Sequence, residues 1–275
     1  MSASTTASCP ILTYHSQLLF GSDYANNSHV ALKDDLARVA ASGRRIVPLP
    51  QLVEALAGRA AMPDLDRVVC ISFDDGPDFD WLDIDHPEHG PQPGFARILR
   101  EHWAAHPEAS PVAASSFVIA DASARTAISR SAMDGHDWMH DHWWRAAQDS
   151  GLLAIESHGW DHRHEALGDG SDPQLGHFHA VDDETSCRFQ IDQASAHIAA
   201  LCGERPRLFA YPYGQTSDYL RDEYLPRFEH RHGIVGAVSV EPGYCHPHSS
   251  RWFLPRFVHA AHWQTPEQLG AILRG

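Results

Sequence analysis

Short apolar runs rich in β-branched residues alternate along the chain with segments of helical periodicity. The clearest run, 68–73 (Val-Val-Cys-Ile-Ser-Phe), has no polar period, which predicts a strand buried on both faces. Comparable runs predict strands at 10–15, 46–47, 112–119, 152–155, 208–211, 234–240 and 252–259. Apolar residues at helical spacing predict helices at 32–40, 49–57, 95–102, 144–148, 182–201 (with Ile191, Ala194, Ile198 and Leu201 on the buried face) and 266–273.

This alternation, without a linker-like stretch or a repeat, predicts one α/β domain spanning residues 1–275. Two segments, 78–93 and 121–141, show no periodicity and are expected to be long irregular loops. The polar clusters fall at the C-terminal ends of the predicted strands, where barrel and open-sheet α/β enzymes assemble their sites. Function is therefore expected at that edge of the sheet.

Composition narrows the classes of partner. A net charge of −15 argues against a nucleic-acid footprint and against binding to an anionic membrane. The first nine residues carry neither a basic nor an apolar segment of a signal peptide, and no apolar run is long enough to span a bilayer. Together with five cysteines that show no CxxC pairing, this predicts a cytoplasmic protein with reduced, mostly buried thiols.

Candidate chemistry begins with two carboxylates, Asp74 and Asp75, directly after the buried run and before Gly76. Adjacent carboxylates at a buried strand end repel each other and lose hydration, and a bound cation relieves both costs. His158 and His162 follow another apolar run. Two imidazoles and one carboxylate leave open coordination positions, as in catalytic rather than structural zinc sites.

The chain contains 21 histidines, so histidine spacings also arise by chance. The His-x-x-x-His spacing occurs three times, and His136 and His140, with His142, form a rival cluster. That cluster does not follow an apolar run, and a solvated loop with buried tryptophans accounts for it better.

Three segments in order resemble the first motifs of the polysaccharide deacetylase (NodB-homology, carbohydrate esterase) family: 72–77 (Ser-Phe-Asp-Asp-Gly-Pro), 158–162 (His-Gly-Trp-Asp-His) and 209–214 (Phe-Ala-Tyr-Pro-Tyr-Gly). Segment 10–16 also resembles the opening of many members, and segment 253–257 resembles a late strand of some. The resemblance therefore covers nearly the whole chain. It implies a distorted (β/α) barrel of about seven strands.

The resemblance also implies one divalent metal ion, zinc in preference to nickel, cobalt, manganese or iron, held by Asp75, His158 and His162. Asp74 would then be the general base, and the backbone N–H of Tyr213 would help to hold the oxyanion. Such a metal-bound water is acidic enough to lose its proton to a nearby carboxylate.

The chain departs from the family pattern at the residues that assist the base and the leaving group. Ala210 stands where many members have an arginine that orients the base; Arg256 or Arg207 would replace it, and Arg256 is preferred because it lies on a predicted strand. The late Leu-x-His motif that supplies the general acid is absent, as is the usual Asp-Trp motif. His262 is the preferred acid over His259.

We therefore expect a metal-dependent hydrolase that removes an acyl group, most simply acetyl, from the nitrogen of an acetamido sugar or a related amide, on a small-molecule or oligosaccharide substrate. A catalytically silent carbohydrate-binding protein on the same barrel is the alternative. Fe(II)-dependent oxygen chemistry ranks last, because it leaves Asp74 without a role. Several tryptophans lie in or beside the loops expected around the site, where they could stack on sugar rings or pack a loop against the barrel, which is the commoner role. They are Trp81, Trp138, Trp143, Trp144, Trp160 and Trp263.

Overall fold

The computed structural model describes residues 7–107 and 113–275. Its strands are β1 (Cys9–Tyr14), β2 (Arg45–Ile46), β3 (Val68–Phe73), β4 (Ile84–His86), β5 (Gly90–Gln92), β6 (Ala114–Val118), β7 (Leu153–Ser157), β8 (Leu208–Ala210), β9 (Gly236–Val238), β10 (Tyr244–Cys245) and β11 (Phe257–Val258). Its α-helices are α1 (Ser28–Ala41), α2 (Leu49–Leu56), α3 (Phe95–Ala105), α4 (Ala122–Ala132), α5 (Trp144–Ser150), α6 (Glu184–Cys187), α7 (Ala194–Cys202), α8 (Leu225–Arg227), α9 (Glu229–His232) and α10 (Pro266–Arg274).

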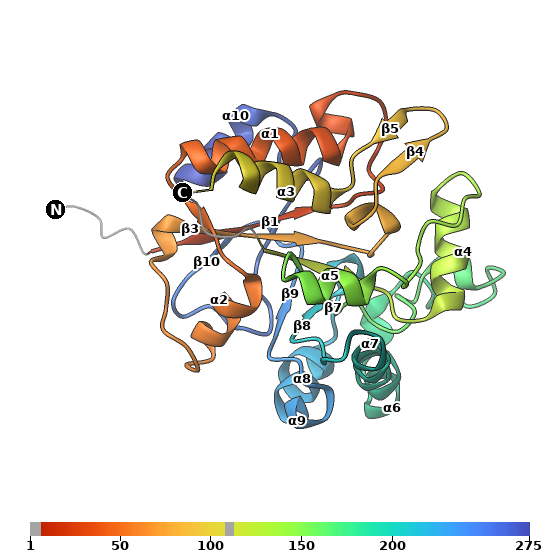
Figure 1. Ribbon diagram of the computed structural model, residues 1–275. Helices are drawn as coiled ribbons and strands as arrows, with labels where there is room; N and C mark the ends of the chain where they lie inside the picture. The colour runs from red at the N-terminus through yellow and green to blue at the C-terminus, as the bar shows by residue number, and fades with distance from the viewer. Residues whose placement is uncertain (1–6, 108–112) are drawn as a thin grey trace.

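A curled sheet forms the centre of the molecule (Figure 1). Its strands follow the order β10-β1-β3-β6-β7-β8-β9, and all of these pairs are parallel except β1 with β10. Strand β11 adds to β1, and Leu254 just before it bridges Val238 of β9. The segment from Leu254 to Val258 therefore connects the two ends of the curl. The predicted α/β class and distorted barrel of about seven strands are confirmed.

The helices cover the outside of this sheet. Helices α1, α3 and α10 pack together on one side, and α5 and α7 lie against β7 (Figure 1). Strand β3 is buried along its whole length, as its uniform apolar character predicts. Helix α1 begins after Asn27, whose side chain accepts hydrogen bonds from two backbone N–H groups of the first turn.

The two segments expected to be irregular contain regular structure, so that prediction was wrong. Residues 84–92 form the small antiparallel hairpin β4–β5. Residues 122–132 form helix α4, capped by the side chain of Asp121. The hairpin strands are short and partly exposed, and α4 is rich in Ala and Ser, so neither carries a strong apolar period.

Other predicted elements differ in extent. The strand expected over 252–259 is regular only at Phe257–Val258; Trp252 lies in a turn, and Leu254 forms only an isolated bridge to Val238. Leu201, expected on the buried face of its helix, is 37% exposed. The predicted start of strand β6 at Val112 lies outside the described residues.

Two further predictions concern the environment of the chain. All five cysteines are free and buried, as expected. Among the described residues, no helix has the length and apolar character needed to cross a membrane.

Candidate active site

The parallel register brings the C-terminal ends of neighbouring strands level. Tyr14 of β1 pairs with Phe73 of β3, so His15 and Asp74 follow at the same height. The backbone N–H of His158, after β7, donates to the carbonyl of Val118 at the end of β6 (2.9 Å). Residues distant in sequence therefore meet at one edge of the sheet.

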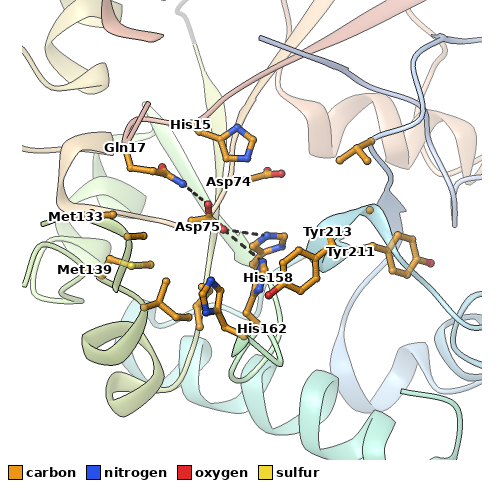
Figure 2. Close-up of a pocket in the computed structure, with 16 residues that line it drawn as sticks. His15, Gln17, Asp74, Asp75, Met133, Met139, His158, His162, Tyr211 and Tyr213 are labelled. Carbon is orange, nitrogen blue, oxygen red and sulfur yellow. Dashed lines mark hydrogen bonds and ion pairs between the residues drawn. The ribbon is translucent and has the colours of Figure 1, made fainter. Parts of the chain in front are cut away.

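Asp75, His158 and His162 come together at this edge (Figure 2). One oxygen of the Asp75 carboxylate lies 3.4 Å from Nε2 of His158 and 3.7 Å from Nε2 of His162. One potential ligand atom from each residue lies within 4.8 Å of the others. Both histidines are buried, and Asp75 is partly buried. The sequence predicted this group from the ends of two apolar runs.

His158 is oriented as a metal ligand requires. It donates its Nδ1–H to the carbonyl oxygen of Ala210 (2.8 Å), so Nε2 is the nitrogen that faces Asp75 and that would bind an ion once it has lost its proton. Burial and the charge of His158 lower the pKa of His162 to about 3, so this second imidazole is neutral at pH 7. A carboxylate and two imidazole nitrogens are a suitable donor set for a divalent ion such as zinc. The residues present therefore fit such an ion.

Burial opposes ionisation of Asp75, but the hydrogen bond from Nε2 of His158 and the nearby rings of His15 and His162 outweigh it. They hold the pKa of Asp75 well below its ordinary value. The carboxylate is therefore charged in the pH range in which a metal would bind.

Asp74 faces a different partner. Nη1 and Nη2 of Arg256 donate to its two carboxylate oxygens, both at 2.7 Å, and Arg256 is fully buried. Nε of Arg256 donates to the carbonyl of Ser239 (2.7 Å), which fixes the guanidinium plane. Burial would raise the pKa of Asp74, but Arg256 outweighs it and the pKa is lowered. Arg207, the other predicted partner, pairs instead with Glu54.

Left-handed backbone conformations shape the turns that carry these residues. Asp75, His162 and Tyr213 have φ values of 74°, 61° and 57°. Non-glycine residues adopt this region at a cost, and it recurs at functional sites where surrounding contacts hold it. Gly76 follows with a φ of 66°, and a Cβ there would lie 2.6 Å from Cγ1 of Val118. Glycine is therefore required directly after the two aspartates.

These residues line a cavity of about 240 Å³. Asp74, Asp75, His158 and His162 form one part of it. Apolar residues form a second part, and Figure 2 shows Met133 and Met139 on the opposite side of Asp75 from Tyr213. This apolar wall comprises Ile119, Ile128, Ala132, Met133 and Met139. Its helix, α4, belongs to the segment expected to be irregular.

Two cavity residues, His15 and Gln17, were not among the predicted site residues. Both lie in the turn after β1, while Ser16 between them points away and donates to Asp80 (2.6 Å). The signal was present in the sequence. His15 follows a buried apolar run, as Asp74, Asp75 and His158 do.

The predicted general acid, His262, is not among the described residues that line the cavity. Its Nδ1 accepts the backbone N–H of Val258 (2.8 Å) within the turn after β11. The chain turns directly after β11, at Ala260 with a φ of 67°, and this turn carries His262 back to Val258. His259 is buried beneath the site, where its Nδ1 lies 3.0 Å from the hydroxyl oxygen of Ser28 and its ring stacks on Tyr14.

The rival cluster is only partly assembled. Asp78, His140 and His142 lie close enough to share an ion, whereas His136 stacks on Trp138. The oxygens of Asp78 already accept hydrogen bonds from the backbone N–H and Nδ1 of His140 (2.8 and 2.7 Å) and from the indole of Trp143 (3.2 Å). Both histidines are exposed. This arrangement describes a structural brace better than a metal site.

The tryptophans weighed for sugar stacking do not line the cavity within the described residues. Trp143, Trp144 and Trp263 are buried in the core. Trp138 lies at a neighbouring hollow, where His136 already covers it. Packing of loops against the barrel accounts for these side chains.

Comparisons with known proteins agree with the geometry of the site. A family model described as polysaccharide deacetylase matches residues 61–225, more than half of the chain. The chain belongs to this family. The matched region contains the strands and turns that carry Asp74, Asp75, His158, His162 and Tyr213.

Solved structures of similar fold include other deacetylases. IcaB from Ammonifex degensii is 19% identical, with 98% of each chain covered and a TM-score of 0.64. A polysaccharide deacetylase from Bacillus cereus is 13% identical, covering 98% of this chain and 69% of that one, with a TM-score of 0.62. The deacetylase PplD from Streptococcus pyogenes, solved with acetate, is 15% identical, covering 98% and 100%, with a TM-score of 0.61. No curated protein sequence matches this polysaccharide deacetylase family member.

Proposed function

We propose that this protein is a metal-dependent deacetylase that hydrolyses the amide bond of an N-acetylated sugar. The proposal rests on one observation above all. A three-ligand group, Asp75, His158 and His162, lies beside a separate buried carboxylate, Asp74, in one cavity. Family membership supports the same reaction.

Asp75, His158 and His162 would hold the divalent ion, with zinc as the best match to the donor set. When bound, the ion polarises the scissile carbonyl and lowers the pKa of a water molecule. The hydrogen bond from His158 to Ala210 holds the imidazole in the tautomer that this role needs.

Asp74 would be the general base. Arg256 keeps its carboxylate ionised and fixed by two hydrogen bonds, so the carboxylate is ready to accept a proton from water. Ala210 stands where many family members have the arginine that orients the base, and this difference is the main objection to activity. Arg256 would supply the missing contact from another strand. The catalytically silent alternative therefore loses its strongest argument.

Tyr213 and His15 would complete the reaction. The backbone N–H of Tyr213, in the left-handed turn beside His162, would stabilise the developing oxyanion. His15 lies in the cavity, and its nearby ring contributes to the lowered pKa values of both Asp74 and Asp75, so we propose it in place of His262 as the donor of a proton to the departing amine. The apolar wall would accept the methyl group of the acetyl.

The test combines metal content with release of acetate from a panel of N-acetylated sugars and oligosaccharides. We expect His158→Ala to lose bound zinc, whereas Asp74→Asn should retain it and lose turnover by about 10²- to 10⁴-fold. His142→Ala, in the exposed Asp78 group, is the matched control and should keep both zinc and activity. Loss of zinc from His142→Ala but not from His158→Ala would overturn the assignment of the metal ligands. Full activity of Asp74→Asn would refute the assignment of Asp74 as the general base.

A further inference from the structure

The apolar wall of the cavity is larger than an acetyl group requires. Its five side chains come from three segments: Ile119 directly after β6, helix α4 with Met133 after it, and Met139 in the segment before α5. The cavity of about 240 Å³ has room for roughly eight groups of the size of a water molecule, at about 30 Å³ each. Beyond its carbonyl, an acetyl group fills the space of only one such group.

The wall offers no hydrogen-bond partner to a polar ligand. None of its five side chains carries a nitrogen or an oxygen atom. A sugar ring presents hydroxyl groups, and each hydroxyl that loses water on burial needs a partner in exchange. Gln17 also lines the cavity, but its Nε2 is bonded to Asp75 and its Oε1 is buried. The wall therefore fits an alkyl group better than a sugar ring.

The wall is also preformed. Arg125 of α4 is buried; its Nε donates to the carbonyl of Met139 (2.9 Å), and its Nη1 donates to the carbonyl of Ile119 (2.9 Å). These bonds hold the three segments together, and four of the wall residues belong to one buried apolar cluster. No binding energy is therefore needed to assemble the wall when a ligand enters.

Figure 2 shows how the wall lies relative to the proposed catalytic groups. Met133 and Met139 lie on the opposite side of Asp75 from Tyr213, and His15 lies near Asp74 and away from both methionines. The carbonyl carbon of an amide carries an oxygen, a nitrogen and the acyl chain. In the proposed reaction the oxygen faces the N–H of Tyr213 and the nitrogen faces His15. The acyl chain is the substituent left to point toward the methionines.

We infer that the preferred substrate carries an N-acyl chain of four to six carbons, which lies along the apolar wall. The inference rests on the proposed function and specifies its acyl group. A hexanoyl chain has five carbons beyond its carbonyl, which occupy about 150 Å³ at the same allowance and therefore fit the cavity. Ala132 is exposed, and Ile128 and Met133 retain 6% and 7% of their surface, so a chain in the cavity can contact them. Methionine side chains adapt to chains of different length.

A series of acyl groups tests the inference on the unmodified protein. The substrates are the N-acetyl, N-butanoyl and N-hexanoyl forms of glucosamine and of its β-1,4-linked trimer, and kcat/KM is measured from release of the free amine with zinc saturating. Each methylene buried against the wall contributes about 0.8 kcal/mol, which is about 4-fold. We therefore expect kcat/KM for butanoyl to exceed that for acetyl by about 15-fold, and the value for hexanoyl to equal or exceed that for butanoyl.

A variant that fills the cavity tests the position of the chain. Ala132→Phe adds a ring at an exposed wall position, so it should lower the butanoyl-to-acetyl ratio of kcat/KM by about 10-fold. Ala122→Phe, at an exposed position on the first turn of the same helix and not among the residues that line the cavity, is the matched control and should leave the ratio unchanged. Circular dichroism checks that both variants are folded.

The outcomes separate the inference from the proposed function. Hydrolysis of acetyl substrates with slower or no hydrolysis of the longer chains overturns the inference and leaves the proposed function intact. A preference for longer chains that Ala132→Phe does not reduce places the chain elsewhere and overturns the assignment to the wall. Failure of the zinc-loaded wild type to hydrolyse any compound of this series, or to release acetate from the panel of N-acetylated sugars, refutes the proposed function and the inference with it.

Discussion

The pair formed by Arg256 and Asp74 allows a quantitative prediction. Arg256 has no exposed surface, Asp74 is 3% exposed, and two hydrogen bonds of 2.7 Å join them. Replacing Arg256 by methionine leaves a buried carboxylate without its cation, a change that costs about 3–5 kcal/mol of stability in comparable buried pairs. Burial then acts on Asp74 with only His158 and His15 opposing it, so the pKa of Asp74 rises.

A protonated Asp74 cannot accept a proton, so Arg256→Met should lower kcat/KM at pH 7 by about 10²-fold or more and move the acid limb of the pH–rate profile to higher pH. Because Arg256 lowers the folded-state pKa of Asp74, the stabilising effect of the pair is present above the ordinary carboxyl pKa. It is lost as the pH falls through the folded-state pKa. The stability difference between wild type and variant should therefore shrink in acid.

The assay is a pH series of kcat/KM with zinc saturating, paired with urea unfolding at each pH. Asp74→Asn combined with Arg256→Met is the control: the double variant contains no unpaired charge, so it should be more stable than Arg256→Met alone. An acid limb at the same pH in wild type and Arg256→Met would refute the claim that this arginine keeps the base ionised. A double variant no more stable than Arg256→Met would refute the energetic argument.

Three further predictions address other residues of the site. His15→Gln should slow hydrolysis of an unactivated amide by about 10²- to 10⁴-fold and slow hydrolysis of an ester with a good leaving group much less. His262→Gln should change neither rate. The reverse pattern in steady-state kinetics would restore His262 as the acid. Burial raises the pKa of Asp80 to about 7, so the folded metal-free protein keeps this proton from about pH 4 to 7 while the unfolded chain loses it, and stability should fall across that range. Asp80→Asn should flatten the decline in urea unfolding, and parallel curves for the two proteins would contradict this. Gly76→Ala should lower the free energy of unfolding by about 1–3 kcal/mol and weaken zinc binding. Gly58→Ala, with a φ of 71° but nothing within 4 Å of the added Cβ, should lower it less and bind zinc normally. Equal effects in thermal melts and zinc titrations would argue against the close contact with Val118.

The sequence predicts the parts of the molecule that follow directly from buried strands. Asp74, Asp75, His158 and His162 each come soon after an apolar run, and parallel register brings such ends together without further information. His15 has the same signal and lies in segment 10–16, but it belongs to none of the three motifs from which the site residues were predicted. The position of His262 away from the cavity has a local cause, because a left-handed Ala260 turns the chain directly after β11, and an alanine residue gives no sequence signal for that conformation.

Structure that depends on tertiary contacts was harder to predict. Helix α4 presents Ala124 and Ile128 to a small cluster with Ile119 and Met139, so its helical state is supported by packing against distant segments more than by its own periodicity. The hairpin β4–β5 contains Gly, Pro and His in strands of three residues, a composition typical of loops. Helix α4 borders the site, and the apolar wall of the cavity was therefore not predicted.

The position of Arg256 shows why the missing arginine on β8 does not imply a missing function. An orienting cation need only reach the interior of the curled sheet beside Asp74, and any strand facing that interior provides a place for it. Here it comes from the segment between Leu254 and Val258, which connects β9 to β1. Nε of Arg256 bonds to Ser239 after β9, and its guanidinium bonds to Asp74 after β3, so the same side chain joins the two ends of the curl. Closure of the sheet and ionisation of the proposed base are therefore physically coupled, since any change that opens this seam also removes the cation from Asp74.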